Sequence, residues 1–171
     1  MSASGVHVRA LGPDEWENLR EMRLFALRTE PGVFLSTYDK EAALAAEEWR
    51  ATLSLDDGRV FGLFEDARLI GITGVFTWKH DPSRKTAVFA MSYILPQYRH
   101  RGFSRLMYEA RLEWVDAQPQ FEKIVVSHRE GNEISAKANR PFGFEFVRTE
   151  MKSWPDGTTG NELVYEKRLR C

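Results

Sequence analysis

The sequence predicts an α/β domain in which helices pack on a mixed β-sheet. Apolar residues repeat at helical spacing in some segments and form short strand-like runs in others, in the order β-α-α-β-β-β-α-β-α-β-β. A helical segment separates strand-like runs at 86–95 and 124–128, and this unit predicts a right-handed parallel crossover. No internal repeat and no linker rich in Pro, Gly or Ser divides the 171 residues, so we expect one domain spanning residues 1–171.

The first half of the chain is expected to form a strand, two helices and a hairpin. Pro13 suits the first position of a helix, because its missing N–H would have no partner there. A second amphipathic stripe ends at the turn-forming sequence Asp56-Asp57-Gly58. The expected elements are a strand at 6–10, helices at 13–28 and 39–53, and strands at 60–64 and 69–78.

The second half contains the expected crossover and a C-terminal hairpin. Pro96 closes a strand, and apolar residues at i, i+3, i+4, i+7 and i+11 from Phe103 predict a helix. The turn sequence "PDGTTG" predicts a hairpin between the last two strands. The expected elements are a strand at 86–95, a helix at 103–114, a strand at 124–128, a short helix between 132 and Pro141, and strands at 144–154 and 163–169.

Composition excludes several function classes. The 24 Lys and Arg residues nearly balance the 25 Asp and Glu residues, so no global field attracts nucleic acid or a membrane surface. No apolar run approaches the roughly 18 residues of a membrane span. The single cysteine, Cys171, cannot form an internal disulfide, and we expect a reducing, cytoplasmic location. Any recognition of an anion must therefore be local.

A local cluster of positive charge precedes the helix that starts at Phe103. Arg99, His100 and Arg101 come directly before Gly102, which has no Cβ and allows a ligand close to the main chain. The first N–H groups of a helix have no internal partners, so this turn fits a phosphate or pyrophosphate. The alternative is a solvated turn with arginines that serve solubility. Neither a Walker loop nor the dinucleotide motif Gly-x-Gly-x-x-Gly occurs in the chain.

Two stretches resemble the GCN5-related N-acetyltransferase (GNAT) superfamily. "YILPQYRHRGFSRLMYEA" resembles its acyl-CoA motif, Gln/Arg-x-x-Gly-x-Gly/Ala, with Ser104 in place of the last glycine or alanine. "GNEISAKANRPFGFEFV" resembles its second motif, in which Asn132 opens a helix that leads to Gly143-Phe144. The element order agrees along the whole chain. The resemblance implies a mostly antiparallel sheet with one central parallel crossover and helices on both faces.

The resemblance also implies how the cosubstrate acetyl-CoA would bind. The amides of residues 101–104 and the basic side chains would meet the pyrophosphate, and the backbone of the strand end would bind the pantetheine arm. Asn132 would contact the cofactor, although a helix N-cap is an equally good role for it. No metal is expected. The implied cofactor-binding residues are Ile94, Leu95, Arg99, His100, Arg101, Gly102, Phe103, Ser104 and Asn132.

The strand at 86–95 lacks the carboxylate that many relatives use as general base, so the resemblance assigns no base there. Ser92 is the polar residue on its alternating face, and His128 on the next strand has a suitable intrinsic pKa. Asn139 occupies the position where the family commonly has a tyrosine that acts as the general acid. The catalytic candidates are therefore Ser92, His128 and Asn139. Open alternatives are Glu65, Asp66, Glu130 or a water as base, and Tyr93, Tyr98, Tyr108 or water as proton donor.

The expected reaction is direct acetyl transfer to a primary amine of a small molecule, an amino-acid analogue or a protein N-terminus. Family members form the acceptor pocket from stretches that correspond here to "LRTEPGVFLSTYDKE" and "SWPDGTTGN". A homodimer through the C-terminal strands is expected by the same resemblance. The competing hypothesis is a catalytically weak acyl-CoA-binding or sensing module. A nucleic-acid binder that uses "RHR" and "KRLR" is disfavoured by the net charge of −1.

Overall fold

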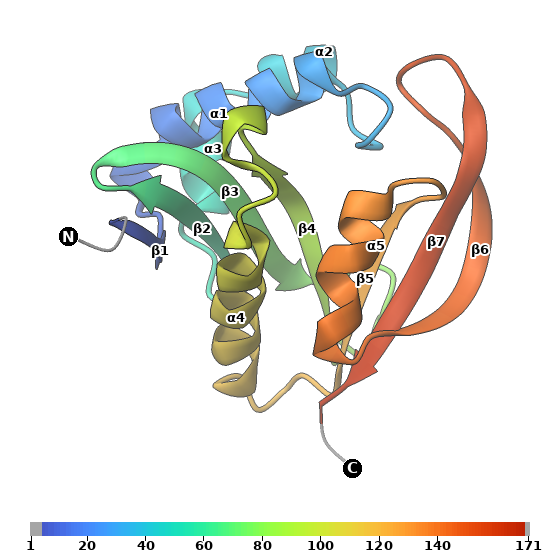
Figure 1. The fold of residues 1–171 in the computed structure, drawn as a ribbon. Helices are drawn as coiled ribbons and strands as arrows, with labels where there is room; N and C mark the ends of the chain where they lie inside the picture. Colours follow the sequence, from blue (N-terminus) through green and yellow to red (C-terminus); the bar gives the residue numbers. More distant parts are fainter. Residues whose placement is uncertain (1–4, 170–171) are drawn as a thin grey trace.

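The computed structural model describes residues 5–169, which form a seven-stranded mixed sheet (Figure 1). Its strand order is β1-β2-β3-β4-β5-β7-β6, and the pair β4–β5 is parallel whereas the other five pairs are antiparallel. The expected fold class and its single parallel crossover are confirmed. The strands are β1 (Val6–Ala10), β2 (Gly58–Glu65), β3 (Arg68–Thr77), β4 (Thr86–Ile94), β5 (Lys123–Arg129), β6 (Glu145–Ser153) and β7 (Thr159–Arg168).

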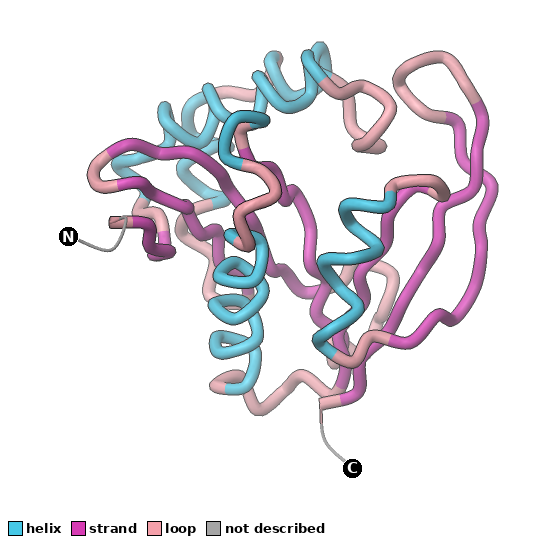
Figure 2. Tube along the Cα trace, in the orientation of Figure 1, coloured by secondary structure: helices cyan, strands magenta, loops and turns pink. Residues whose placement is uncertain are grey.

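Helices cover both faces of the sheet (Figure 2). On one face α1 (Trp16–Thr29) and α3 (Ala46–Thr52) pack on β2, β3 and β4 through a cluster that includes Leu19 and Trp49. On the other face α4 (Phe103–Asp116) and α5 (Glu133–Asn139) lie against the central strands, and Tyr108 and Phe144 belong to this second cluster. The remaining helices are α2 (Tyr38–Ala42) and three 3-10 turns, at Pro13–Glu15, Pro96–Tyr98 and Arg140–Phe142.

The single helix expected over 39–53 is wrong, because the structure has two short helices there. Thr37 caps α2 by accepting a hydrogen bond from the Lys40 amide. Ala45 then adopts an extended conformation, and the Glu48 carboxylate accepts from its N–H at 2.7 Å. A carboxylate three residues into a helix satisfies an N–H that the helix itself leaves free. This contact starts α3 afresh and allows the chain to turn between the two helices.

The expected start of the last strand, at 163, is also wrong. The strand β7 begins at Thr159, because its polar N-terminal residues pair with β6 on one side, Thr159 opposite Ser153, and with β5 on the other, Glu162 opposite Arg129. Strand partners on both sides override the weak strand pattern of "TGNE". Cys171 lies outside the described residues.

The most important feature for function is a separation of β4 from β5. Their ladder contains three pairs and ends where Val88 faces Val125, although both strands continue beyond this point. Figure 1 shows the two strands close together near one end and apart toward the other. Met91 has a positive φ of 51° and lies in a bulge of β4 against β3, which bends the strand. Within the described residues, the edge of β4 that faces β5 therefore has backbone groups with no strand partner.

Candidate functional site

The start of α4 is an open, electropositive end of a helix. Gly102 is its N-cap residue, with φ at 80° in the left-handed region that favours glycine. A Cβ built on Gly102 meets nothing within 4 Å, so this side of the turn faces open space. No side chain caps α4, and its first turn contains no acidic residue. Phe103 and Ser104, which begin the helix, are half-buried. The first amides of α4 can therefore reach an anion in front of Gly102.

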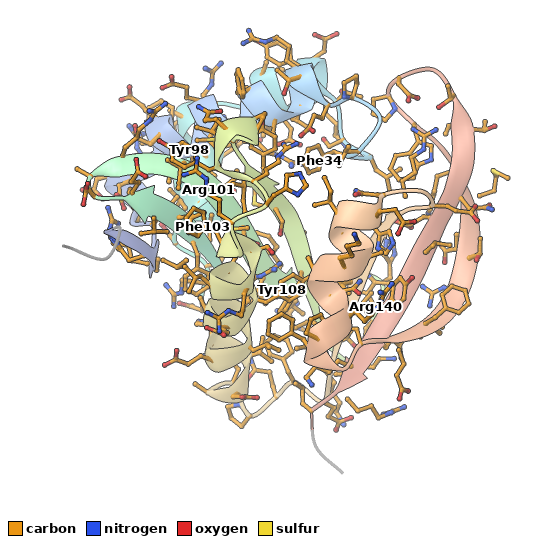
Figure 3. The ribbon with its side chains drawn as sticks, viewed as in Figure 1. Phe34, Tyr98, Arg101, Phe103, Tyr108 and Arg140 are labelled. Carbon is orange, nitrogen blue, oxygen red and sulfur yellow. The ribbon has the colours of Figure 1, made fainter. Side chains whose placement is uncertain are left out.

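The three basic residues before Gly102 differ in their surroundings. Arg99 donates to both carboxylate oxygens of Glu30, at 3.1 and 2.9 Å, and its Nε donates to the Ile94 carbonyl at 2.8 Å. Arg101 is exposed, and its guanidinium lies 5.5 Å from the Tyr98 ring centroid (Figure 3). His100 is exposed with φ at 63°. Arg99 thus ties the turn to the end of α1, whereas the positive charge of Arg101 is free to meet a ligand.

The backbone at the end of β4 directs two neighbouring amides to opposite sides. The Leu95 N–H donates to the Ile70 carbonyl of β3 at 2.9 Å. Successive residues of a strand direct their N–H groups to opposite edges, so the Ile94 amide faces the edge of β4 that has separated from β5. Ile94 can therefore donate to an extended ligand between the strands. The Leu95 amide is already paired within the sheet.

The helix α5 places two asparagines in different roles. Asn132 is its N-cap residue and accepts from the Ser135 amide at 3.2 Å, so the N-cap role is observed. Asn139, in the last turn, is only 3% exposed, and its buried Nδ2 has no hydrogen-bond partner. An unpaired buried amide costs about 1–3 kcal/mol, and a partner from outside the chain would recover part of this. Asn139 can donate a hydrogen bond to such a partner but cannot supply a proton.

Ser92 belongs to a polar chain between β3, β4 and α4. Its Oγ lies 2.6 Å from Oγ1 of Thr73, which is fully buried on β3. The guanidinium of Arg111 donates to the same Ser92 Oγ at 3.2 Å through Nη1. Ser92 itself is exposed, although both of its partners are buried. Ser92 lies four residues beyond Val88, where the β4–β5 ladder ends.

His128 lies on β5, on the sheet face covered by α5, and is 6% exposed. Its ring stacks on Tyr165 with centroids 5.2 Å apart, and its buried Nδ1 has no hydrogen-bond partner. Burial lowers the pKa of His128, and the charge of Glu133 opposes this in part. The imidazole is therefore neutral at pH 7 and able to accept a proton.

The alternative acids and bases occupy less favourable surroundings. The Tyr98 hydroxyl donates to Glu65 at 3.1 Å, and Glu130 accepts from Asn161 at 2.9 Å, so both carboxylates already have partners. Burial raises the pKa of Tyr108, which lies between α4 and α5 (Figure 3). Tyr93 is buried on the α1 side of β4, and its hydroxyl has no partner. Burial therefore keeps the Tyr108 hydroxyl protonated near pH 7.

Arg129 joins the two loops in which the family resemblance implies an acceptor pocket. Its Nη1 donates to the Gly32 carbonyl at 3.1 Å and to Asp156 at 2.9 Å, and its Nη2 donates to Thr158 at 2.6 Å. The guanidinium lies 5.0 Å from the Trp154 ring centroid. The loop after α1 and the β6–β7 hairpin are therefore held together, and Figure 1 shows both where β4 and β5 are apart.

Sequence reasoning did not find Arg111, Thr73, Arg129 or Glu30. One signal was available for Arg111, because it lies one helical turn after Met107 and so interrupts the apolar stripe of α4 with a charge. The other three act through contacts between residues far apart in the chain, up to 97 positions for Arg129 and Gly32. No local pattern marks them.

Two other kinds of site are absent from the described part of the chain. None of the helices in residues 5–169 is long and apolar enough to cross a membrane. The same residues contain no group of three or more His, Cys, Asp or Glu side chains arranged to hold a metal ion.

Comparison with known proteins identifies the family. A family model described as the acetyltransferase (GNAT) family matches residues 16–144, and no curated protein sequence matches the chain. A GNAT-family acetyltransferase from Streptococcus pneumoniae has a TM-score of 0.82 at 16% identity, covering 96% of this chain and 99% of its own. The ribosomal-protein-S5-alanine acetyltransferase from Vibrio fischeri has a TM-score of 0.78 at 13% identity, covering 98% and 95%. The Salmonella typhimurium structure of yncA with acetyl-CoA has a TM-score of 0.75 at 16% identity, covering 98% and 96%.

The structural matches show a shared fold, and the family model matches most of the chain. Together they confirm the resemblance that the turn at Arg99–Ser104 and the stretch from Asn132 to Phe144 suggested. This chain belongs to the GNAT family of acetyltransferases.

Proposed function

We propose that the protein is an acetyl-CoA-dependent N-acetyltransferase that moves the acetyl group directly to a primary amine. The observation that carries this proposal is that the uncapped start of α4 and the separation between β4 and β5 form one continuous site. The Ile94 amide lies between the start of α4 at Gly102 and the gap between the two strands. A long ligand with an anionic end and an amide-bearing arm fits this combination, and acetyl-CoA has both. Acetyl-CoA bound to the Salmonella relative supports the same donor.

Each implied cofactor contact has a physical basis in these surroundings. The amides of Arg101, Gly102, Phe103 and Ser104 would bind the pyrophosphate, with Arg101 and His100 adding charge at the exposed rim. Ile94 would bind the pantetheine arm through its free amide, while Arg99 and Leu95 act indirectly by shaping the turn and the strand end.

The remaining cofactor contact and the chemistry involve α5 and β5. Asn132 would approach the cofactor from the N-cap of α5. Acetyl transfer requires a neutral amine, and His128 is neutral at pH 7 because burial lowers its pKa. It is our candidate for the base, directly or through water. Asn139 would stabilise the sulfur by donating a hydrogen bond from its unpartnered Nδ2.

The acceptor would enter between the loop after α1 and the β6–β7 hairpin. Phe34 lies in this loop, and Trp154 lies under Arg129 at the base of the hairpin (Figure 3 labels Phe34). Small amines, amino-acid analogues and protein N-termini remain the proposed acceptor classes. The Vibrio fischeri relative is named for an alanine of ribosomal protein S5, which supports including peptides in the first panel.

The test is calorimetric titration with acetyl-CoA and CoA, followed by thiol release across a panel of amines. Binding with turnover of any amine supports the enzyme. Binding with no turnover across small amines and N-terminal peptides favours the acyl-CoA-sensing alternative, which the lack of a carboxylate on β4 also favours. A protein that binds neither ligand contradicts both.

Three further expectations belong to the same proposal. We propose that residues 1–171 act as one domain, that the protein works in the cytoplasm, and that it forms a homodimer. Light scattering on the purified protein tests the dimer, and a molar mass of one chain would contradict it.

A further inference from the structure

A buried polar chain lies under the bulge of β4, outside the cofactor contacts described above. It runs from Thr73 on β3 to Ser92 on β4 and then to Arg111 on α4. Thr73 is 0% exposed and Arg111 is 1% exposed, whereas Ser92 reaches solvent. This polar chain of three side chains therefore has two buried ends, Thr73 and Arg111, and one accessible hydroxyl between them, that of Ser92.

These contacts decide the direction of the Ser92 O–H group. Arg111 has no acceptor atom, so Ser92 Oγ must accept from its Nη1. Among the described residues, Ser92 is the sole hydrogen-bond partner of the Thr73 hydroxyl. If Ser92 donated to Thr73, the buried Thr73 hydrogen would have no acceptor, at a cost of about 1–3 kcal/mol. Thr73 therefore donates, Ser92 accepts two hydrogen bonds, and its own hydrogen points to the accessible side.

The same hydroxyl lies next to an unneutralised positive charge. The Arg111 guanidinium stacks between Phe89 and Tyr108, 4.2 and 4.6 Å from their ring centroids. Its Nε donates to the Met107 carbonyl of its own helix, and its buried Nη2 has no hydrogen-bond partner. No carboxylate in residues 5–169 pairs with it. Burial lowers the pKa of Arg111 to about 10, so it stays cationic at neutral pH.

The position of Ser92 along β4 places this donor on the path of the cofactor arm. A ligand that is anchored at Gly102 and passes the Ile94 amide runs next toward Ser92 and then toward Val88, where the strands meet. Ser92 is two residues beyond Ile94 in that direction, roughly 7 Å along a strand. The reactive end of the arm, which carries sulfur, is the part that reaches deepest between the strands.

We propose that Ser92 donates a hydrogen bond to the sulfur of CoA and that Arg111, with Thr73, is the positioning residue that holds the Ser92 hydrogen outward. This inference rests on the proposed function. During transfer the amine nitrogen forms a bond to the acetyl carbon, and the carbon–sulfur bond breaks with its electron pair left on sulfur. The thiolate accepts the Ser92 hydrogen bond and is stabilised by the nearby guanidinium charge, while the amine proton leaves to the base.

Few other groups on this face of the sheet titrate between pH 7 and 9. Tyr108 of α4 stays neutral because burial raises its pKa, and His128 of β5 stays neutral because burial lowers its pKa. Arg111 of α4 stays charged, and Glu133 of α5 faces His128. A thiol of ordinary pKa, about 8.5, titrates within this range. Stabilising the thiolate lowers that pKa when CoA is bound.

The experiment compares the affinities of CoA and of desulfo-CoA, in which hydrogen replaces the thiol, by calorimetry from pH 6.5 to 9.5. All other ionising groups are common to the two ligands, so their affinity ratio isolates the thiol. In the wild-type protein the ratio should rise about tenfold in favour of CoA as pH increases, equivalent to a thiol pKa about one unit lower when bound. Ser92→Ala and Arg111→Met should reduce the rise to about threefold or less, since the Asn139 amide remains as a donor to the sulfur, and Ser92→Thr should restore the full rise.

Matched variants separate this role from a structural one. Arg105→Met removes an exposed arginine from the same helix and should leave the ratio as in the wild type. Every variant should bind desulfo-CoA like the wild type. Ser92→Ala leaves Thr73 and Arg111 without this acceptor, and the resulting loss of stability, about 1–3 kcal/mol, does not enter the ratio of the two affinities. A flat ratio in the wild type, or an undiminished tenfold rise in Ser92→Ala, would overturn the inference while leaving the proposed function intact. Failure of the wild type to bind either ligand would overturn both.

Discussion

Replacing Gly102 with glutamate is the most direct test of the anion site at the start of α4. The change has two effects that must be separated. A side chain at a φ of 80° strains the backbone by roughly 1–2 kcal/mol, although it meets no atom within 4 Å. The carboxylate would also stand in front of the helix amides that we assign to the pyrophosphate. Strain lowers stability, whereas charge lowers affinity.

The electrostatic effect can be worked from Coulomb's law. Two like unit charges about 4 Å apart repel by about 4 kcal/mol at an effective dielectric constant of about 20. Gly102 is exposed, and screening by solvent reduces this to roughly half. About 2 kcal/mol corresponds to roughly 30-fold weaker binding of CoA. Gly102→Ala carries the strain without the charge, and its affinity should fall less than about threefold, since the helix amides remain free.

The control is Gly157→Glu at the tip of the β6–β7 hairpin. Gly157 has φ at 86° and equally open surroundings, so the same substitution brings similar strain and the same charge far from α4. Both glutamate variants should unfold at similarly reduced temperatures, and calorimetry should show weakened CoA binding only for Gly102→Glu. If both variants bind CoA within about threefold of each other, the pyrophosphate does not lie at Gly102.

Three other predictions concern the neighbouring groups. Because burial lowers the pKa of His128, this histidine takes up a proton at higher pH in the unfolded chain than in the folded protein. The free energy of unfolding should therefore fall as pH drops below about 6.5. Urea titrations of His128→Phe should lack this decline. Asn139→Ala should reduce kcat less than about tenfold, since water can protonate a thiolate of moderate pKa; a much larger loss would show an active role for the amide. Arg101→Ala should weaken CoA binding, reduce the salt dependence of that binding and leave Tm unchanged. Arg99→Ala should instead lower Tm, because its hydrogen bonds to Glu30 are lost. The reverse pattern would contradict the geometry.

The fold was predictable because its signals are local. Strand-like runs bounded by Gly and Pro, and the stripe from Phe103, each lie within one element, and the crossover follows from their order. The two wrong predictions, the single helix over 39–53 and the start of the last strand, arise from contacts outside the local sequence. The residues around Leu44 have high helix propensity throughout, so only the side-chain contact of Glu48 reveals the break. The residues from Thr159 form a strand because β5 and β6 supply partners.

The site was predictable where a sequence motif fixes the backbone, as at Gly102. It was less predictable where the role of a side chain depends on its contacts with residues far away in the sequence. Arg99 and Arg101 look equivalent in the sequence, but Glu30, 69 positions from Arg99, neutralises only that one. Ser92 was identified as a catalytic candidate because it is the polar residue on its face of the strand. Its role depends on the direction of one hydrogen, which Thr73 and Arg111 set across two other elements.

A fully buried guanidinium without a carboxylate partner lowers stability unless other contacts offset its desolvation. Here two aromatic rings and two hydrogen bonds offset part of that cost, and Nη2 recovers none of it. An apolar residue would complete the stripe of α4 without removing a charge from water, so stability alone does not explain Arg111. We therefore expect Arg111→Met to unfold within about 1.5 kcal/mol of the wild type in urea, in either direction. A decrease of more than about 3 kcal/mol in the free energy of unfolding would show that Arg111 has a structural role. Unchanged stability together with lost thiolate recognition would show that Arg111 serves to orient the Ser92 hydroxyl.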